Sequence, residues 1–139
     1  MPEYRAAVVA LAAPRLIIGG KSMGGRVASM VADALHGEGA IAGLLCLGYP
    51  FHPPGRPDRP RTAHLRGLAA PALICQGTRD PFGTPEDVAG YALSERIEVL
   101  WFEDGDHDLK PRIRVTGLTA ADHLRTMANA VAAWAARLA

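Results

Sequence analysis

The residues best suited to chemistry are a serine, an aspartate and a histidine, each of which follows a short apolar run. Ser22 is the central residue of the G-K-S-M-G sequence at 20–24, and Asp80 and His107 come later in the chain. A serine hydroxyl becomes a nucleophile when a histidine accepts its proton and a carboxylate orients that histidine. These three residue types, in the chain order Ser, Asp, His, predict acyl transfer through a nucleophilic serine.

The G-x-S-x-G pattern predicts a sharp turn between a strand and a helix, with Ser22 at its apex. Gly20 and Gly24 are expected to be required because a Cβ atom at either position would collide with the adjoining strand or helix. The backbone N–H of Met23, at the helix N-terminus, is the expected oxyanion donor. The alternative interpretation is a glycine-rich turn with an ordinary capping serine.

The G-K-S sequence at 20–22 also matches the end of a phosphate-binding P-loop. That motif needs a glycine five residues before its last glycine, and Arg15 occupies this position here. Nucleotide binding through a P-loop is therefore not expected, and an ATP titration tests this alternative.

An alternation of strands and helices is expected to position the candidate residues. Four short apolar runs, at 16–18, 41–47, 72–76 and 97–102, predict strands buried on both faces, as in a parallel sheet flanked by helices. Since Ser22, Asp80 and His107 each follow one of these strands, all three are expected at the carboxyl edge of the sheet. The predicted fold class is α/β, with a parallel sheet of about four strands and flanking helices.

Helices are expected at 3–13, ended by Pro14, and after each of the first, third and fourth strands. Thr84 and Thr119 predict helix starts because Asp87 and Asp122 complete their capping boxes. Helical spacing predicts one buried face made of Val27, Met30, Val31, Ala34 and Leu35, and another made of Leu124, Met127, Val131, Trp134 and Leu138. Residues 49–60 carry five prolines and predict a long excursion over the surface.

Composition excludes several function classes. The 139 residues suit one domain over 1–139, and the net charge of +1 provides no field for capturing nucleic acid or an anionic membrane. The longest charge-free run, 39–55, is shorter than the roughly 20 apolar residues that a bilayer requires, and no secretory signal is visible, so a cytoplasmic location is expected. Cys46 and Cys75 lie in apolar runs and predict buried free thiols. No metal ion or cofactor is expected.

Four segments together resemble the α/β-hydrolase superfamily: G-G-K-S-M-G-G-R at 19–26, Y-P-F-H-P-P-G at 49–55, Q-G-T-R-D at 76–80 and G-D-H-D-L-K at 105–110. More closely, they are similar to its dienelactone-hydrolase-like branch, related to the testis-expressed protein 30 and NSL-complex regulatory subunit 3 hydrolase-like domain. The resemblance implies that Ser22 is the nucleophile, Asp80 the acid and His107 the base in the hydrolysis of an ester or thioester. In a serine hydrolase the proline-rich segment 49–60 is expected to line or cover the acyl or leaving-group side, with Tyr49, Phe51 and His52 as the substrate-binding residues.

The same resemblance implies a departure from the superfamily, in which about eight strands occur and the nucleophile follows the fifth. Only the C-terminal half is expected here, and only Met23 N–H can be assigned to the oxyanion hole. An unpaired strand edge near Leu16, Ile17 and Ile18 predicts a homodimer or pairing with another half. The alternative functions are a non-catalytic hydrolase-like interaction module and an inactive truncated fragment, and Ser22→Ala separates a hydrolase from a binding module.

Overall fold

The computed structural model of the chain describes residues 2–11 and 15–138. In chain order the elements are α1 (Pro2–Leu11), β1 (Ile17–Lys21), α2 (Met23–Gly37), β2 (Gly43–Leu47), the 3-10 helix η1 (Ala63–Leu65), β3 (Ala72–Gly77), α3 (Pro85–Ala89), β4 (Ile97–Phe102), α4 (Ile113–Thr116) and α5 (Ala120–Ala136). Within this described part of the chain, no helix has the length and apolar character needed to cross a membrane.

The four strands form one parallel sheet in the order β1-β2-β3-β4, which confirms the predicted fold class. Ile18 pairs with Leu44, Leu44 with Ala72, and Ala72 with Ile97, so each strand lies beside the next one along the chain. All four carboxyl ends therefore lie along one edge of the sheet. β1 is an edge strand, as expected, and its pairing with a partner strand stays a prediction.

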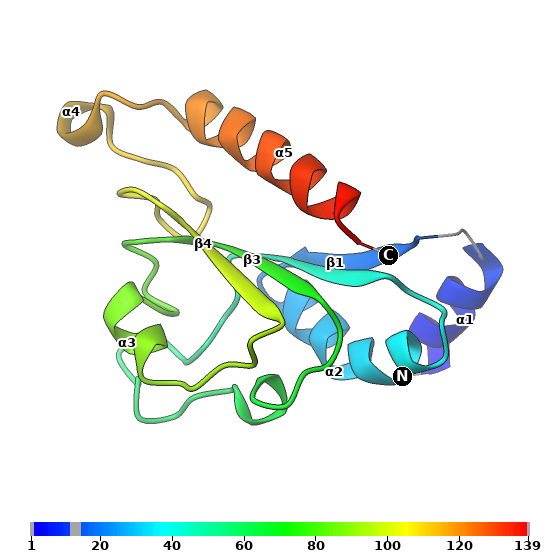
Figure 1. Ribbon diagram of the computed structural model, residues 1–139. Coiled ribbons are helices and arrows are strands. Elements are labelled where there is room, and N and C mark those ends of the chain that lie inside the picture. The colour runs from blue at the N-terminus through cyan, green and yellow to red at the C-terminus, as the bar shows by residue number, and fades with distance from the viewer. Residues whose placement is uncertain (1, 12–14, 139) are drawn as a thin grey trace.

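Helices cover both faces of the sheet (Figure 1). α5 lies over one face, while α1, α2 and α3 lie on the opposite side. Alternate strand residues supply two apolar clusters: Leu44 and Ile74 belong to the cluster that includes α2, and Leu73 belongs to the one that includes Trp134 of α5. Burial on both faces explains why the strands have apolar runs without alternation.

The helix faces differ from those predicted. α2 buries Gly25, Ala28, Ser29, Ala32 and Leu35, whereas Met30 is 55% exposed. The small residues let the helix axis approach the sheet closely, which a face with Met30 would prevent. In α5, Leu124 is 60% exposed because the adjacent His123 turns inward and its Nε2 donates to the Glu103 carbonyl oxygen at 2.8 Å.

Several element boundaries also differ from the predictions. β1 extends to Lys21, and β2 begins at Gly43; the part of the predicted first helix at 12–13, and Pro14, lie outside the described residues. Both capping boxes are confirmed, with Thr84 Oγ1 accepting from Asp87 N at 3.3 Å and Thr119 Oγ1 accepting from Asp122 N at 3.1 Å. The short helices η1 and α4 were not predicted, because each is only one turn long.

Candidate active site

Ser22 sits at the turn between β1 and α2 with backbone angles φ 52° and ψ −122°. A positive φ is costly for a serine, so the surrounding structure must hold this turn in place. The Ser22 N–H donates to the Leu47 carbonyl oxygen at 2.8 Å, which ties the turn to the end of β2. The hydroxyl of Ser22 is thereby presented at the carboxyl edge of the sheet.

The glycines of the turn are only partly those predicted. A Cβ on Gly20 would lie 2.7 Å from the Gly24 carbonyl carbon, so Gly20 is required. Gly24 itself has no neighbour within 4 Å of the place where its Cβ would lie, among the residues that the structure describes. Gly25 has that role instead, since its Cβ would lie 2.7 Å from the Gly20 carbonyl oxygen and 3.2 Å from Cys46 Cβ. The expectation for Gly24 was wrong because the helix approaches the strand one residue later.

The structure brings Ser22, His107 and Asp80 into one hydrogen-bonded row. His107 Nε2 lies 2.9 Å from Ser22 Oγ, and His107 Nδ1 lies 2.9 Å from Asp80 Oδ2. A neutral imidazole fits both contacts if Nδ1–H donates to the carboxylate and Nε2 accepts from the hydroxyl. The Asp80 side chain is fully buried, whereas a quarter of the His107 side chain is exposed. This arrangement can remove a proton from the serine hydroxyl.

Asp80 is fixed by neutral hydrogen-bond donors. Its Oδ1 accepts from Phe82 N at 2.8 Å, and its Oδ2 accepts from Gln76 Nε2 at 3.2 Å as well as from His107. Gln76 is fully buried and makes further hydrogen bonds. Its Oε1 accepts from Tyr49 N at 2.8 Å, and its Nε2 donates to the Gly83 carbonyl oxygen at 3.2 Å. The sequence analysis missed Gln76, although a single amide within an apolar strand indicates a buried polar contact.

Gly48 and Phe82 hold the His107 residue from two sides. Gly48 has φ +64°, and a Cβ there would lie 2.7 Å from the His107 carbonyl oxygen and 3.4 Å from its ring. The ring of Phe82 packs against the imidazole at an interplanar angle of 35°, with centroids 4.5 Å apart. Neither residue was singled out in the sequence, because their importance depends on contacts between separate loops.

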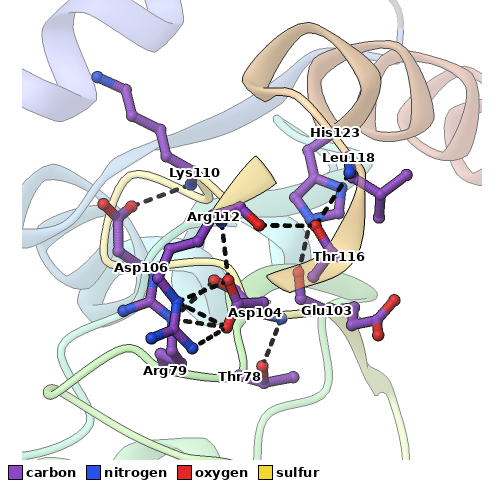
Figure 2. Close-up of polar contacts among 10 residues, drawn as sticks. All are labelled: Thr78, Arg79, Glu103, Asp104, Asp106, Lys110, Arg112, Thr116, Leu118 and His123. Carbon is purple, nitrogen blue, oxygen red and sulfur yellow. Dashed lines mark hydrogen bonds and ion pairs between the residues drawn. The ribbon is translucent and has the colours of Figure 1, made fainter. Parts of the chain in front are cut away.

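An ion-pair network anchors the loop that carries His107 (Figure 2). The Asp104 carboxylate accepts from Arg112 Nε at 3.0 Å, from Arg112 Nη2 at 2.5 Å and from Arg112 N at 2.8 Å. Arg79 Nε lies 2.9 Å from Asp104 Oδ1, and Asp104 N donates to Thr78 Oγ1 at 2.8 Å. Hydrogen bonds from Arg112 hold the pKa of Asp104 well below its ordinary range. The network links the ends of β3 and β4, which carry Asp80 and His107.

The two aspartates beside His107 have separate partners. Asp106 Oδ1 accepts from the backbone N–H of Asp108 at 2.8 Å and of Lys110 at 3.0 Å, so Asp106 shapes the turn. Asp108 forms an ion pair with Lys21, and this hydrogen bond lowers the pKa of Asp108. The ion pair joins the residue before Ser22 to the residue after His107. As predicted, Asp80 and not either neighbour contacts the imidazole.

The backbone N–H of Met23 lies at the start of α2, directly after the serine. Within the described part of the chain it donates to no backbone or side-chain acceptor, as expected for the first residue of a helix. The positive end of the α2 dipole favours negative charge at this position. Met23 N–H is therefore suited to stabilise an oxyanion beside Ser22.

Tyr49, Phe51 and His52 do not have the accessible side chains that substrate contact requires. Tyr49 and Phe51 are fully buried with ring centroids 4.8 Å apart, and His52 is 2% exposed. His52 Nε2 is bound to Asp87 Oδ2 at 2.9 Å, which fastens the segment to α3. The expected surface excursion thus begins only after His52. The rings of Tyr49 and Phe51 complete the core, and His52 has a structural role through its contact with Asp87.

A cavity of about 250 Å³ opens beside His107. It is lined by the end of β1 and β2, the His107 loop and the first half of α5: Lys21, Leu47, His107, Asp108, Leu109, Lys110, Ala120, His123, Leu124 and Met127. Leu124 and Met127 were predicted to be core residues of α5. Their position here shows that part of the apolar face of α5 is turned toward the candidate site.

Both cysteines are buried free thiols, as predicted. Burial raises the pKa of Cys46 to about 12 and the pKa of Cys75 to about 11. Thiols with such values stay protonated at neutral pH and are poor nucleophiles. The serine is therefore the candidate nucleophile in this region.

The parallel sheet, with a serine on a strand-to-helix turn and a histidine and an aspartate from later strand ends, is the arrangement of an α/β-hydrolase. The family model described as "Alpha/beta hydrolase domain" matches residues 1–136. The chain belongs to this family.

Solved structures with the same fold include three hydrolases. The esterase domain of a Rhodothermus marinus protein is 17% identical with a TM-score of 0.69, over 98% of this chain and 68% of that one. An alpha-beta serine hydrolase homologue from Coxiella burnetii is 17% identical with a TM-score of 0.61, over 90% and 51%. A predicted CIB-like hydrolase from Thermoplasma acidophilum is 18% identical with a TM-score of 0.55, over 76% and 48%. The chain thus spans about two thirds of the first relative and about half of the others.

Proposed function

We propose that this chain is a serine hydrolase that cleaves a carboxylic ester or thioester through an acyl-enzyme, with Ser22 as nucleophile, His107 as base and Asp80 as the orienting acid. The observation that carries the proposal is the row of two 2.9 Å contacts from Ser22 Oγ through the His107 imidazole to the buried Asp80 carboxylate. Membership of the alpha/beta hydrolase family supports the reaction class.

Acylation follows from this geometry. Ser22 Oγ attacks the carbonyl carbon while His107 Nε2 takes the hydroxyl proton. Met23 N–H donates to the oxyanion that develops on the carbonyl oxygen. The tetrahedral intermediate then collapses, the bond to the alcohol or thiol breaks, and His107 returns its proton to the leaving oxygen or sulfur. Asp80 keeps Nδ1–H toward the carboxylate and stabilises the positive imidazolium.

Deacylation repeats the same steps with water. His107 takes a proton from a water molecule, which attacks the acyl carbon, and then returns a proton to Ser22 Oγ as the carboxylic acid leaves. The quarter of the His107 side chain that is exposed gives water access to the base. Atoms and charge balance over the cycle, and the enzyme is restored.

The narrower assignment to carboxylic esters and thioesters rests on resemblance. The four sequence segments are similar to the dienelactone-hydrolase-like branch, and one structural neighbour is described as an esterase domain and another as a serine hydrolase homologue. The low pKa that a reactive thiol would need is absent from both cysteines, whose pKa values are raised, which favours serine chemistry.

Fluorophosphonate labelling of the purified chain tests this function. We expect one phosphonyl adduct, mapped to Ser22 by peptide mass, and its loss in both Ser22→Ala and His107→Ala. Circular dichroism of each variant controls for folding. An adduct at another residue, or a folded wild-type chain that takes no label, contradicts the proposal.

A non-catalytic interaction module is the second candidate. It is favoured by the single oxyanion donor, Met23 N–H, that the described residues allow us to assign beside Ser22. Removing one oxyanion donor typically costs roughly 100-fold or more in rate. Ser22→Ala separates the two candidates, because a hydrolase loses turnover and a binding module keeps its binding.

A further inference from the structure

The cavity beside His107 is lined by both apolar and charged side chains. Its apolar part comes from Leu47 and Leu109 and from Ala120, Leu124 and Met127 of α5. Two lysines and one aspartate supply the charge: Lys21, Asp108 and Lys110. An apolar hollow with a few placed charges is typical of a small-molecule site.

The charges do not cancel. Lys21 and Asp108 neutralise each other in an ion pair. Among residues 2–11 and 15–138, the Lys110 ammonium has no ion-pair partner. The lysine and aspartate side chains that line the cavity therefore sum to one positive charge in excess, and this excess favours an anion.

Hydrogen bonds fix the backbone of Lys110, while its side chain extends away from them. Its N–H donates to Asp106 Oδ1 at 3.0 Å, and its carbonyl accepts from Asp106 N at 3.1 Å. In Figure 2 its side chain extends away from Asp106 and from the cluster of Asp104 with its two arginines. A fixed backbone reduces the conformational freedom that is lost when the ammonium binds a ligand.

The placement of His107 indicates which part of a substrate enters the cavity. In the proposed reaction, His107 Nε2 gives its proton to the leaving oxygen or sulfur, so the leaving group must lie beside the imidazole. His107 and the three residues after it line the cavity. The alcohol or thiol part of the substrate, and not the acyl part, is therefore the part that fits there.

We propose that the substrates are esters or thioesters with a small alcohol or thiol part, in which an apolar ring or chain carries one anionic group, and that Lys110 recognises this anionic group. The inference rests on the proposed hydrolase function and adds the substrate class. A volume of about 250 Å³ is below the roughly 300–1,000 Å³ of sites for drug-sized ligands, which suits a single ring or a short chain.

A pair of isosteric esters tests the inference: 3-carboxyphenyl acetate, which is anionic, and 3-carbamoylphenyl acetate, which is neutral. The quantity measured is the ratio of their kcat/KM values for the wild type, Lys110→Ala, Lys110→Glu and Arg114→Ala. Arg114 is the matched control, because it is an exposed cation four residues away that does not line the cavity. Both esters transfer the same acetyl group, and their intrinsic difference in leaving-group reactivity cancels when the ratio of a variant is compared with that of the wild type, so a change in the ratio reports the leaving-group site.

We expect Lys110→Ala to lower the carboxyl-to-carbamoyl ratio about threefold to fivefold, the upper part of the range for an exposed ion pair. Lys110→Glu should lower it further, and Arg114→Ala should leave it unchanged. Raising the salt concentration should also lower the wild-type ratio. A ratio that is the same in the wild type and Lys110→Ala, or that falls equally in Arg114→Ala, overturns the inference while hydrolysis stands. Turnover of neither ester above the Ser22→Ala background overturns the proposed function, and the inference with it.

Discussion

Asp80 and His107 follow neighbouring strands, yet they are held in different ways. Asp80 follows the fully buried strand β3 and is fixed by neutral donors from Gln76 and Phe82. His107 lies in a partly exposed loop after the edge strand β4, held by the ion pairs of Asp104 with Arg112 and Arg79. The acid is thus positioned by neutral hydrogen bonds in the core, and the base by turns and by the ion pairs of Asp104. Changes near Asp80 should have larger effects, and changes in the His107 loop should be smaller and sensitive to pH.

The largest effect is expected for Asp80→Asn. An amide cannot stabilise the imidazolium and can favour the wrong histidine tautomer, which lowers kcat by about 10⁴-fold in a comparable triad. Ester turnover of the folded variant measures the loss. The control is Asp108→Asn, which lies next to His107 but pairs with Lys21, and should change kcat by no more than a few-fold. Equal losses in both variants would remove the distinction between the two carboxylates.

Gln76→Leu should be the next most damaging change. The variant leaves the Tyr49 N–H and one Asp80 oxygen without their amide partner inside the core. Buried polar groups without partners cost about 1–3 kcal/mol each, so we expect the free energy of unfolding to fall by about 3 kcal/mol and kcat to fall with it. Urea unfolding measures the first and ester turnover the second. Ser94→Ala, which removes the hydrogen bond to the Leu68 carbonyl and the one accepted from Arg96 N, should cost about 1–2 kcal/mol and leave kcat unchanged.

Gly48→Ala, compared with Gly39→Ala, should separate the effect of backbone strain at a positive φ from the effect of a steric contact with His107. The new Cβ would meet the His107 carbonyl oxygen, so His107 must shift, and we expect kcat to fall about tenfold, equivalent to about 1.4 kcal/mol of barrier. Gly39→Ala places the same residue at a similar φ of +74° in open space. Both variants should lose about 1–2 kcal/mol of stability to backbone strain, but only Gly48→Ala should lose activity. If Gly39→Ala slows turnover equally, contact with His107 is not the cause.

Asp104→Asn should have the smallest effect, and one that depends on pH. Because Arg112 lowers the pKa of Asp104 below its ordinary value of 3.8, the ionised carboxylate stabilises the fold above that pH. This contribution is lost as the pH falls below 3.8, so wild-type stability should decline more steeply there than that of Asp104→Asn. Urea midpoints at several pH values between 7 and 2 measure the two curves. Parallel curves would show that Asp104 does not stabilise the His107 loop through its charge.

The sheet and the three residues Ser22, Asp80 and His107 could be predicted from the local sequence, but the buried faces of the helices could not. Apolar runs mark the strands, and the residues after them must meet at one edge, which is why Ser22, Asp80 and His107 could be chosen together. The burial of Gly25 and the exposure of Leu124 depend on how each helix is rotated against the sheet. That rotation is set by packing between distant segments, which helical spacing alone does not determine.

The supporting residues of the site were hidden for a similar reason. Gln76 and Gly48 act on Asp80 and His107 only because separate strand ends converge. Tyr49 and Phe51 lie in a segment rich in proline, whose composition predicts a surface loop, yet their rings complete the core. In Gln76 the sequence did hold a signal, since a lone amide in a buried strand needs a polar partner.

The central claim is that Ser22 forms a covalent acyl-enzyme with the help of His107. Intact-mass measurement of the chain, quenched in acid within the first turnovers of 4-nitrophenyl acetate, tests it most directly. The account predicts a single acetyl group, mapped to Ser22, that accumulates in the wild type and is absent from Ser22→Ala and His107→Ala. Turnover without an acetyl group on Ser22, or undiminished turnover in Ser22→Ala, would contradict the account.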